Sequence, residues 1–298
     1  MNRQTATARI STTSIPVFGT ATEVVTLCLT PEFEAETLAF LSQRPMHTVG
    51  MVGFIRDNGL VSERNRGTFY GCRNQQGKLE GVALIGHATL METSSDRALQ
   101  AFADLARQSS THLIMGEEER INEFWNYYSE DGQEEIRFAC RELLMELRWP
   151  VQVREEVVEM RLATPDDIEL LLPVHAQMAF EESGINPLET DPEGFHERYA
   201  RRIERGRSWI CVEEGKLTFK AEVVSDTPDA VYLEGVWVSP AKRETGYGVR
   251  CMSQLARNLL SHSKSLVLLV NDENKKAQRF YQKAGFSLRA AYDTIFLK

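Results

Sequence analysis

Two glycines, Gly246 and Gly248, stand where a strand pattern gives way to a helix pattern. The run from Val231 to Ser239 is rich in β-branched and aromatic residues, which predicts a strand, and residues 249–260 follow a helical period. The first turn of a helix leaves backbone N–H groups unpaired, and glycine lets a phosphate approach them closely. This spacing therefore favours phosphate binding. The alternative is an ordinary turn between a strand and a helix.

The composition bounds what kind of protein surrounds this turn. A chain of 298 residues with 42% apolar and 26% charged residues is typical of about two globular domains. The net charge of -9 argues against a nucleic-acid partner, and no apolar run is long enough to cross a membrane. The five cysteines are scattered and contain no C-x-x-C pair, so we expect no disulfide framework, no metal site and a cytoplasmic location.

Residues 1–22 are rich in Ser and Thr and carry Arg3 and Arg9 without an acidic residue. A transit peptide would show an amphipathic stripe, and this segment has none. We expect a flexible terminal arm.

A first domain is predicted over residues 23–150. The expected elements are a hairpin of Gly67–Arg73 and Leu79–Ala88, a helix over Ser95–Gln108, a strand at His112–Met115, and helical stretches through Trp125 and over Arg137–Leu147. The turn at Gly116 continues with three glutamates, where a phosphate would need backbone amides. The first domain is therefore a degenerate relative of the second or an unrelated α/β domain.

The second domain is predicted over residues 157–298. A strand at Val157–Leu162 is followed by a helix from Thr164 to about Glu182 and a helix over Phe195–Glu204. An antiparallel meander of Arg207–Glu213, Lys216–Val224 and Ala230–Ser239 comes next. The remaining expected elements are a helix over Gly246–His262, a strand at Ser265–Val270, a helix over Asn274–Ala284 and a strand at Asp293–Leu297.

This order carries two motifs. V-x-V-x-P-x-x-R-x-x-G-x-G runs from Val236 to Gly248, and N-x-x-A-x-x-x-Y-x-x-x-G-F runs from Asn274 to Phe286. Together they resemble the GNAT superfamily of acyl-CoA-dependent N-acetyltransferases over about half of the chain. The whole chain also resembles bacterial two-domain GNAT proteins with a degenerate N-terminal half. The resemblance implies an α/β fold with a mixed sheet, the acyl-CoA N-acyltransferase fold, in the C-terminal half, and a smaller GNAT-like or α/β N-terminal half.

The resemblance also implies acetyl-CoA as the acyl donor and positions for its contacts. The coenzyme A pyrophosphate would lie on Arg243, Glu244, Thr245, Gly246, Tyr247 and Gly248, the pantetheine arm along Val236, Trp237 and Val238, and further contacts would come from Asn271, Asn274, Ala277 and Tyr281. At Glu244-Thr245 the sequence departs from the family pattern, in which a glycine followed by a basic or small residue is more usual. We expect Glu244 to face solvent.

Three residues are candidates for proton transfer. The family role implied for Tyr281 is general acid toward the coenzyme A thiolate, and the alternative is a core aromatic residue. An amine with a pKa of about 10.4 is neutral in about one molecule in 2,500 at pH 7, which costs about 4.6 kcal/mol, so a base is useful. Glu234 is the first candidate for this base and Glu222 the second. The alternative for both is a solvated carboxylate on a strand.

The expected function is therefore transfer of an acetyl group from acetyl-CoA to a primary amine of a small molecule or a protein. Glu181 and Glu182 could attract a cationic amine or form a solvated helix end. A non-catalytic acyl-CoA-binding sensor or scaffold is the alternative function. We expect no nucleic-acid or membrane partner, and a homodimer is a candidate assembly.

Overall fold

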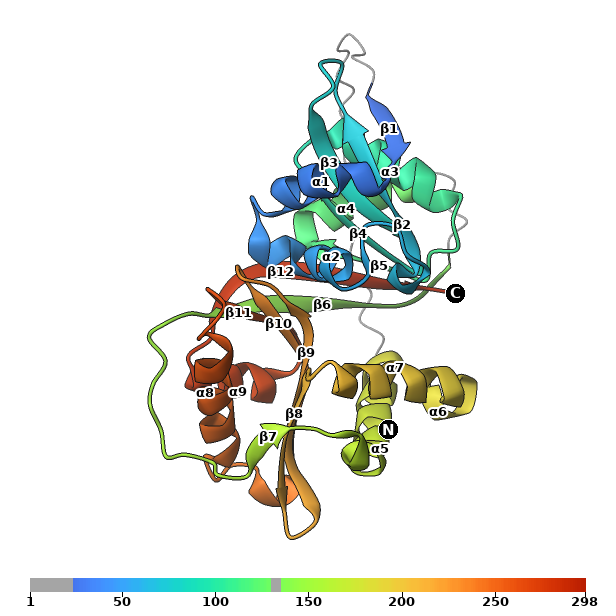
Figure 1. Cartoon of the computed structure of the whole chain (residues 1–298). Coiled ribbons are helices and arrows are strands. Elements are labelled where there is room, and N and C mark those ends of the chain that lie inside the picture. The colour runs from blue at the N-terminus through green and yellow to red at the C-terminus, as the bar shows by residue number, and fades with distance from the viewer. Residues whose placement is uncertain (1–23, 130–134) are drawn as a thin grey trace.

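The computed structural model describes residues 24–129 and 135–298, and the strands of this part of the chain form one mixed sheet (Figure 1). The predicted terminal arm, residues 1–22, lies outside the described residues. The strand order is β1-β2-β3-β4-β5-β12-β6-β11-β10-β9-β8-β7. No helix within the described ranges combines the length and the apolar character needed to cross a bilayer.

The N-terminal half begins with a short strand and two helices, which are followed by a strand-rich segment. Its elements are β1 (Val25–Cys28), α1 (Glu34–Leu41), α2 (Pro45–Asn58), β2 (Gly67–Arg73), β3 (Leu79–Gly86), β4 (Ala88–Thr93), α3 (Asp96–Arg107), β5 (Leu113–Glu117), α4 (Glu118–Tyr128) and β6 (Ile136–Leu147). The predicted hairpin is confirmed as β2 and β3, and Ser95 caps α3 by accepting a hydrogen bond from the N–H of Ala98. The sequence analysis missed β4, which folds back directly after β3.

The C-terminal half follows the predicted order of elements. These are β7 (Met160–Leu162), α5 (Ile168–Ser183), α6 (Pro187–Thr190), α7 (Pro192–Glu204), β8 (Ser208–Glu213), β9 (Lys216–Asp226), β10 (Val231–Val238), α8 (Tyr247–Leu259), β11 (Leu266–Asn271), α9 (Lys275–Ala284) and β12 (Ser287–Leu297). The antiparallel meander is confirmed as β8, β9 and β10. The first strand is shorter than predicted, because Val157 precedes β7.

The predicted helix over Arg137–Leu147 is wrong, because this segment is strand β6. Its glutamates, leucines and methionine are good helix formers, which made a helix the natural prediction. In the fold, β6 pairs with β11 on one edge and β12 on the other, and its last four residues are buried. Tertiary pairing of this kind overrides local propensity.

The two halves exchange strands. In the sheet, β6 lies between β11 and β12, and β12 lies between β5 and β6, all antiparallel to their neighbours. Figure 1 shows β12 in red and β6 in green running side by side across the middle of the molecule. The division into residues 23–150 and 157–298 stays a prediction, and hydrogen bonds between strands join the two parts.

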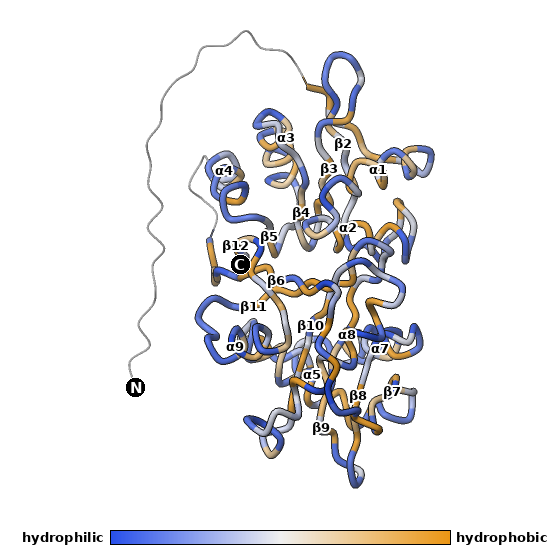
Figure 2. Tube along the Cα trace, turned by 90° about the vertical axis from the view of Figure 1, so that its left-hand side faces the viewer, coloured by the Kyte–Doolittle hydropathy of each residue, from blue (hydrophilic) through white to orange (hydrophobic). Residues whose placement is uncertain are grey.

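The C-terminal part of the sheet is covered on both faces. Residues of α8 and α9 form one hydrophobic cluster with Val236 and Val238, whereas residues of α5 and α7 form another with Trp237. Successive side chains of a strand point to opposite faces, so this alternation assigns the faces of β10. In Figure 2, hydrophobic residues run through the sheet and hydrophilic residues dominate the loop tips.

Candidate active site

A gap opens between β10 and β11 where their backbone pairing ends. The two strands pair in parallel at Val231, Tyr232 and Leu233. Beyond Leu233, β10 continues along β9, while β11 continues along β6 as far as Asn271. The backbone edges that face each other across the gap are therefore free to bind an extended ligand.

A β-bulge lies where β10 leaves β11. Glu234 is opposite Glu222 and Trp237 is opposite Lys220, so β10 has one more residue than β9 over this stretch. Gly235 has a φ of 58°, a conformation that glycine adopts without a steric cost. Bulges beside active sites change the direction of local groups.

The glycine turn leads from β10 into α8 on one side of the gap. Gly246 is the N-cap of α8 with a φ of 83°, which a residue with a Cβ rarely adopts. At Gly248 a Cβ would lie 2.8 Å from Val238 Cγ2 and 3.0 Å from Phe280 Cε2, so the close packing of the turn requires glycine. The backbone N–H groups of the first turn of α8 can therefore approach an anion.

Side chains of the turn face outward or into the core. Glu244 is exposed, as expected, and has a φ of 64°. Arg243 is also exposed and its Nε donates a hydrogen bond to Val238 O at 2.9 Å. Tyr247 is buried, with its hydroxyl 2.8 Å from Thr218 Oγ1, so Tyr247 can offer a ligand its backbone only. Thr245 Oγ1 donates to Lys242 O at 2.8 Å.

The second motif places Tyr281 on α9. Asn274 caps this helix, because its side chain accepts a hydrogen bond from the N–H of Ala277 at 3.0 Å, and Asn271 Oδ1 accepts from the N–H of Glu273 at 2.8 Å. The Tyr281 side chain packs edge-on against Phe280 and Phe286 and is 9% exposed. Among the described residues its hydroxyl has no hydrogen-bond partner. Burial raises the pKa of Tyr281 above its usual value, so the hydroxyl carries its proton at neutral pH.

The two candidate bases differ in their surroundings. Glu234 is exposed at the start of the gap. Glu222 is fully buried, and its carboxylate contacts Lys220 Nζ at 3.1 Å, Tyr199 Oη at 2.7 Å and Ser208 Oγ at 2.5 Å. Burial alone would raise the pKa of Glu222, but these partners and the nearby charges hold it below its ordinary value. Both oxygens of Glu222 are thus engaged.

An acidic group, which we call the acidic mouth, consists of Glu142, Glu182 and Glu234. Glu182 is exposed at the end of α5, yet desolvation by its surroundings and the charges of Glu234 and Glu142 raise its pKa to about 7. Burial and Glu234 also raise the pKa of Glu142, although Thr294 Oγ1 donates a hydrogen bond to its carboxylate at 2.6 Å. Glu142 lies on β6 in the N-terminal half, and the sequence analysis missed it because this segment was predicted to be helical.

Comparisons with known proteins bear on this geometry. Residues 175–286 match the acetyltransferase (GNAT) family model. These residues include the gap, the glycine turn and Tyr281. This stretch of the chain is a GNAT acetyltransferase domain. No curated protein sequence matches the chain.

Solved structures show the same fold over nearly the whole chain. A GNAT-family acetyltransferase from Colwellia psychrerythraea is 14% identical, with 93% of this chain and 100% of that chain covered and a TM-score of 0.58. A tandem GNAT protein from the clavulanic acid biosynthesis pathway is 13% identical, with 91% and 98% covered and a TM-score of 0.56. A GCN5-related N-acetyltransferase from Sphaerobacter thermophilus is 12% identical, with 91% and 94% covered and a TM-score of 0.56.

At these identities the likeness shows the fold, and it covers both halves. The predicted GNAT recognition and the predicted fold class are confirmed. Family membership supports an acyltransferase. The roles of individual site residues stay predictions.

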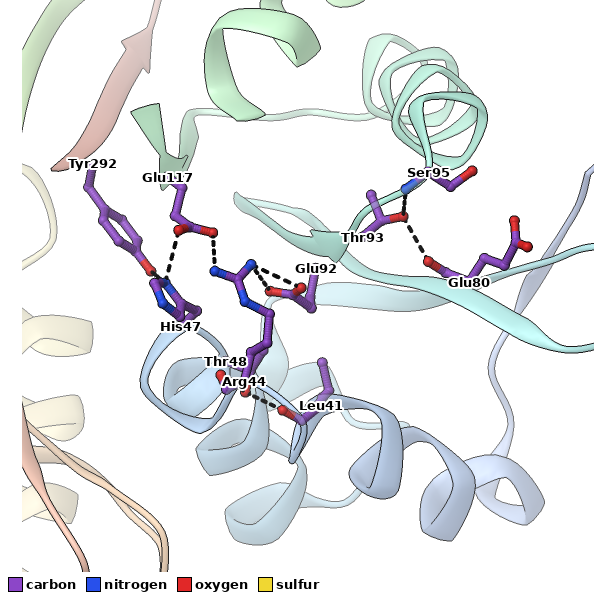
Figure 3. Close-up of polar contacts among 10 residues, drawn as sticks. All are labelled: Leu41, Arg44, His47, Thr48, Glu80, Glu92, Thr93, Ser95, Glu117 and Tyr292. Atoms are coloured by element: carbon purple, nitrogen blue, oxygen red, sulfur yellow. Dashed lines mark hydrogen bonds and ion pairs between the residues drawn. The ribbon is translucent and has the colours of Figure 1, made fainter. Parts of the chain in front are cut away.

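The N-terminal GNAT-like half has a small cavity near its own parallel strand pair, β4 and β5. Its volume is about 60 Å³, room for a few water molecules, since one needs about 10–15 Å³ on the same scale. Arg44 Nη2 lies 2.7 Å from Glu117 Oε2, its Nη1 lies 3.2 Å from Glu92 Oε1, and His47 Nδ1 lies 2.9 Å from Tyr292 Oη (Figure 3). These five side chains line the cavity and pair with one another across it.

The connection from β4 to α3 also differs from the glycine turn. It consists of residues 94 and 95, contains no glycine, and ends at the cap Ser95 with Asp96 in the first helical turn. An acidic first turn repels an anionic ligand. Both features make the C-terminal half the candidate for acyl-CoA chemistry.

Proposed function

We propose that the C-terminal GNAT domain transfers an acetyl group from acetyl-CoA to a primary amine by direct attack. The observation that carries this proposal is the gap between β10 and β11, together with the glycine turn and the Tyr281 hydroxyl, which has no hydrogen-bond partner in the part of the chain that the structure describes. The pyrophosphate would bind the N–H groups at the start of α8, and the pantetheine arm would lie along residues 236–238.

The reaction needs three proton transfers. Glu234, directly or through a water molecule, accepts a proton from the ammonium form so that the neutral amine can attack the thioester carbon. A C–N bond forms, the C–S bond breaks, and Tyr281 donates its proton to the leaving thiolate. The attacking nitrogen loses its second proton as the amide forms, and this proton, passed through a water molecule, restores the Tyr281 hydroxyl. Glu234 is better placed than Glu222 for the first step, because both oxygens of Glu222 already have partners.

The acidic mouth supports a positively charged acceptor. Glu142 and Glu182 come from opposite halves of the chain and, with Glu234, give the entrance a negative potential that attracts an ammonium group. A small-molecule amine or a protein lysine would satisfy this requirement.

Release of free thiol from acetyl-CoA, measured with a panel of amines, tests the proposal. We expect amine-dependent thiol release that falls by about 10²-fold or more in Glu234→Gln, a loss in the usual range for a general base. Acetyl-CoA should also raise the melting temperature. Binding without turnover for any amine would favour the acyl-CoA-binding sensor, and no binding at millimolar acetyl-CoA would refute both functions.

A further inference from the structure

Lys220 is a fully buried lysine that lies directly beneath the bulge of β10; burial lowers the pKa of its ammonium group, and the charge of Glu222 opposes this. Its side chain has no exposed surface, and its Nζ donates a hydrogen bond to the carbonyl oxygen of Gly235 at 3.1 Å. A Cβ added to Gly235 would lie 3.1 Å from this same Nζ, so the bulge packs against the ammonium group without spare room.

Glu222 holds the ammonium group in place. Its Oε1 is 3.1 Å from Lys220 Nζ and accepts a hydrogen bond from Tyr199, while its Oε2 accepts one from Ser208. The ammonium group also lies 6.0 Å from the centre of the Tyr199 ring, on the face that α5 and α7 cover. Lys220 therefore connects a fully bonded carboxylate of β9 to one particular peptide group of β10.

The cost of such a pair indicates a role beyond stability. Burying two charges loses much of their hydration, and well-packed apolar residues often stabilise a fold equally well. The pair does, however, fix the direction in which the Gly235 carbonyl points. In a trans peptide the N–H and C=O groups point in opposite directions. Because Lys220 draws the Gly235 carbonyl toward the α5 and α7 face, the Val236 N–H points toward the face of α8 and α9.

That opposite face carries the groups of the proposed reaction. Val236 and Val238 pack there with α8 and α9, the helices that begin at the glycine turn and contain Tyr281. A backbone N–H aimed at a developing oxyanion is a strong source of transition-state stabilisation, provided that its direction is fixed in advance. A cation on the carbonyl of the same peptide also polarises its N–H.

We propose that Lys220, held by Glu222, is a positioning residue that aims the Val236 N–H at the thioester oxygen of acetyl-CoA. This inference rests on the proposed function. It gives Glu222 a task that differs from proton abstraction: the carboxylate keeps Lys220 charged and in place.

The test uses the full chain and the double variant Lys220→Met/Glu222→Gln, which removes both charges together. Lys220→Met alone would leave Glu222 buried without its cation and could fail to fold. The readouts are the infrared stretching frequency of the ¹³C-labelled thioester carbonyl in bound acetyl-CoA, the Kd for acetyl-CoA, and kcat with an amine that the wild-type protein acetylates. Glu146→Gln/Arg148→Met is the control, because Glu146 is a buried carboxylate of β6, away from the bulge, that lies 2.6 Å from Arg148 and 2.8 Å from Arg289.

In the wild-type protein and in the control, we expect the carbonyl frequency to be lower than in free acetyl-CoA. In the double variant the carbonyl frequency should return toward the value of free acetyl-CoA. We expect kcat to fall by about 10- to 100-fold, because the oxyanion contact is partly lost, and Kd to change by less than about threefold. An unchanged frequency in a folded double variant would overturn the role of Lys220 alone. Absence of acetyl-CoA binding by the wild-type protein would overturn this inference together with the proposed function.

Discussion

Glu244 should weaken both the fold and the binding of coenzyme A, and replacing it tests the turn at residues 243–248. Its φ of 64° brings a Cβ close to the backbone, which costs about 1–2 kcal/mol. Glycine avoids this cost but loses about 0.5–1 kcal/mol more backbone entropy on folding. Glu244→Gly should therefore raise the free energy of unfolding by up to about 1 kcal/mol.

The charge of Glu244 contributes separately to ligand binding. At about 8 Å in water, repulsion between two unit charges costs about 0.5 kcal/mol, so a carboxylate beside the two charges of a pyrophosphate costs about 1 kcal/mol. This corresponds to about a fivefold weaker Kd. Glu244→Gln removes the charge and keeps the Cβ, whereas Glu244→Gly removes both.

Calorimetric titration of coenzyme A into the wild type and both variants measures the charge effect. At about 50 mM salt, where the screening length is about 14 Å, both variants should bind about two- to threefold more tightly, and at about 500 mM, where this length is about 4 Å, the difference should largely disappear. Urea unfolding measures the backbone effect. Glu214→Gly is its control, because Glu214 has a similar φ of 51° in the turn between β8 and β9. An equal Kd for wild type and Glu244→Gln at low salt would refute the pyrophosphate position.

Three further predictions concern the same half. Tyr281→Phe should lower kcat by about 10²-fold or more and leave the Kd for acetyl-CoA nearly unchanged, which separates a proton donor from a packing residue in thiol-release and titration assays. Gly248→Val should cost about 1–3 kcal/mol in urea unfolding, because its side chain would collide with Val238 and Phe280, and should abolish the acetyl-CoA melting shift. The pKa of Glu182, raised to about 7, means that the folded state holds a proton that the unfolded state releases near pH 4.5, so the free energy of unfolding should fall as pH rises from about 4.5 to 7. In Glu182→Gln, the free energy of unfolding, measured at several pH values, should fall less steeply over this pH range. An unchanged pH dependence would contradict the raised pKa of Glu182.

Local signals in the sequence were enough to predict most of the C-terminal half. Thr164 begins a helical segment as expected, with its N–H donating to Asp167 Oδ2 at 2.8 Å, and Asn274 caps α9. The glycine turn was found because Gly246 and Gly248 sit between a strand pattern and a helix pattern. Each of these features depends on residues that are close together in the chain.

Features that depend on distant residues could not be predicted in this way. Strand β6 has the composition of a helix, and only its pairing with β11 and β12 makes it a strand. Glu142 therefore gave no sign that it would reach the site. Lys220 likewise gave no sign in the sequence of its place beneath the bulge. Its contacts are with the Gly235 carbonyl, fifteen residues away, and with Glu222, whose carboxylate is held by Tyr199.

The exchange of strands brings the N-terminal half next to the candidate active site, although its own connection from β4 to α3 contains no glycine. Without β6, the edge of β11 would present unpaired N–H and C=O groups beside the gap. The same strand carries Glu142 to the acidic mouth, and Arg137 Nη1 donates a hydrogen bond to Ser183 O at 2.7 Å at the end of α5. The N-terminal half therefore contributes a strand and an acidic side chain beside the place where we propose that the C-terminal half binds its acceptor.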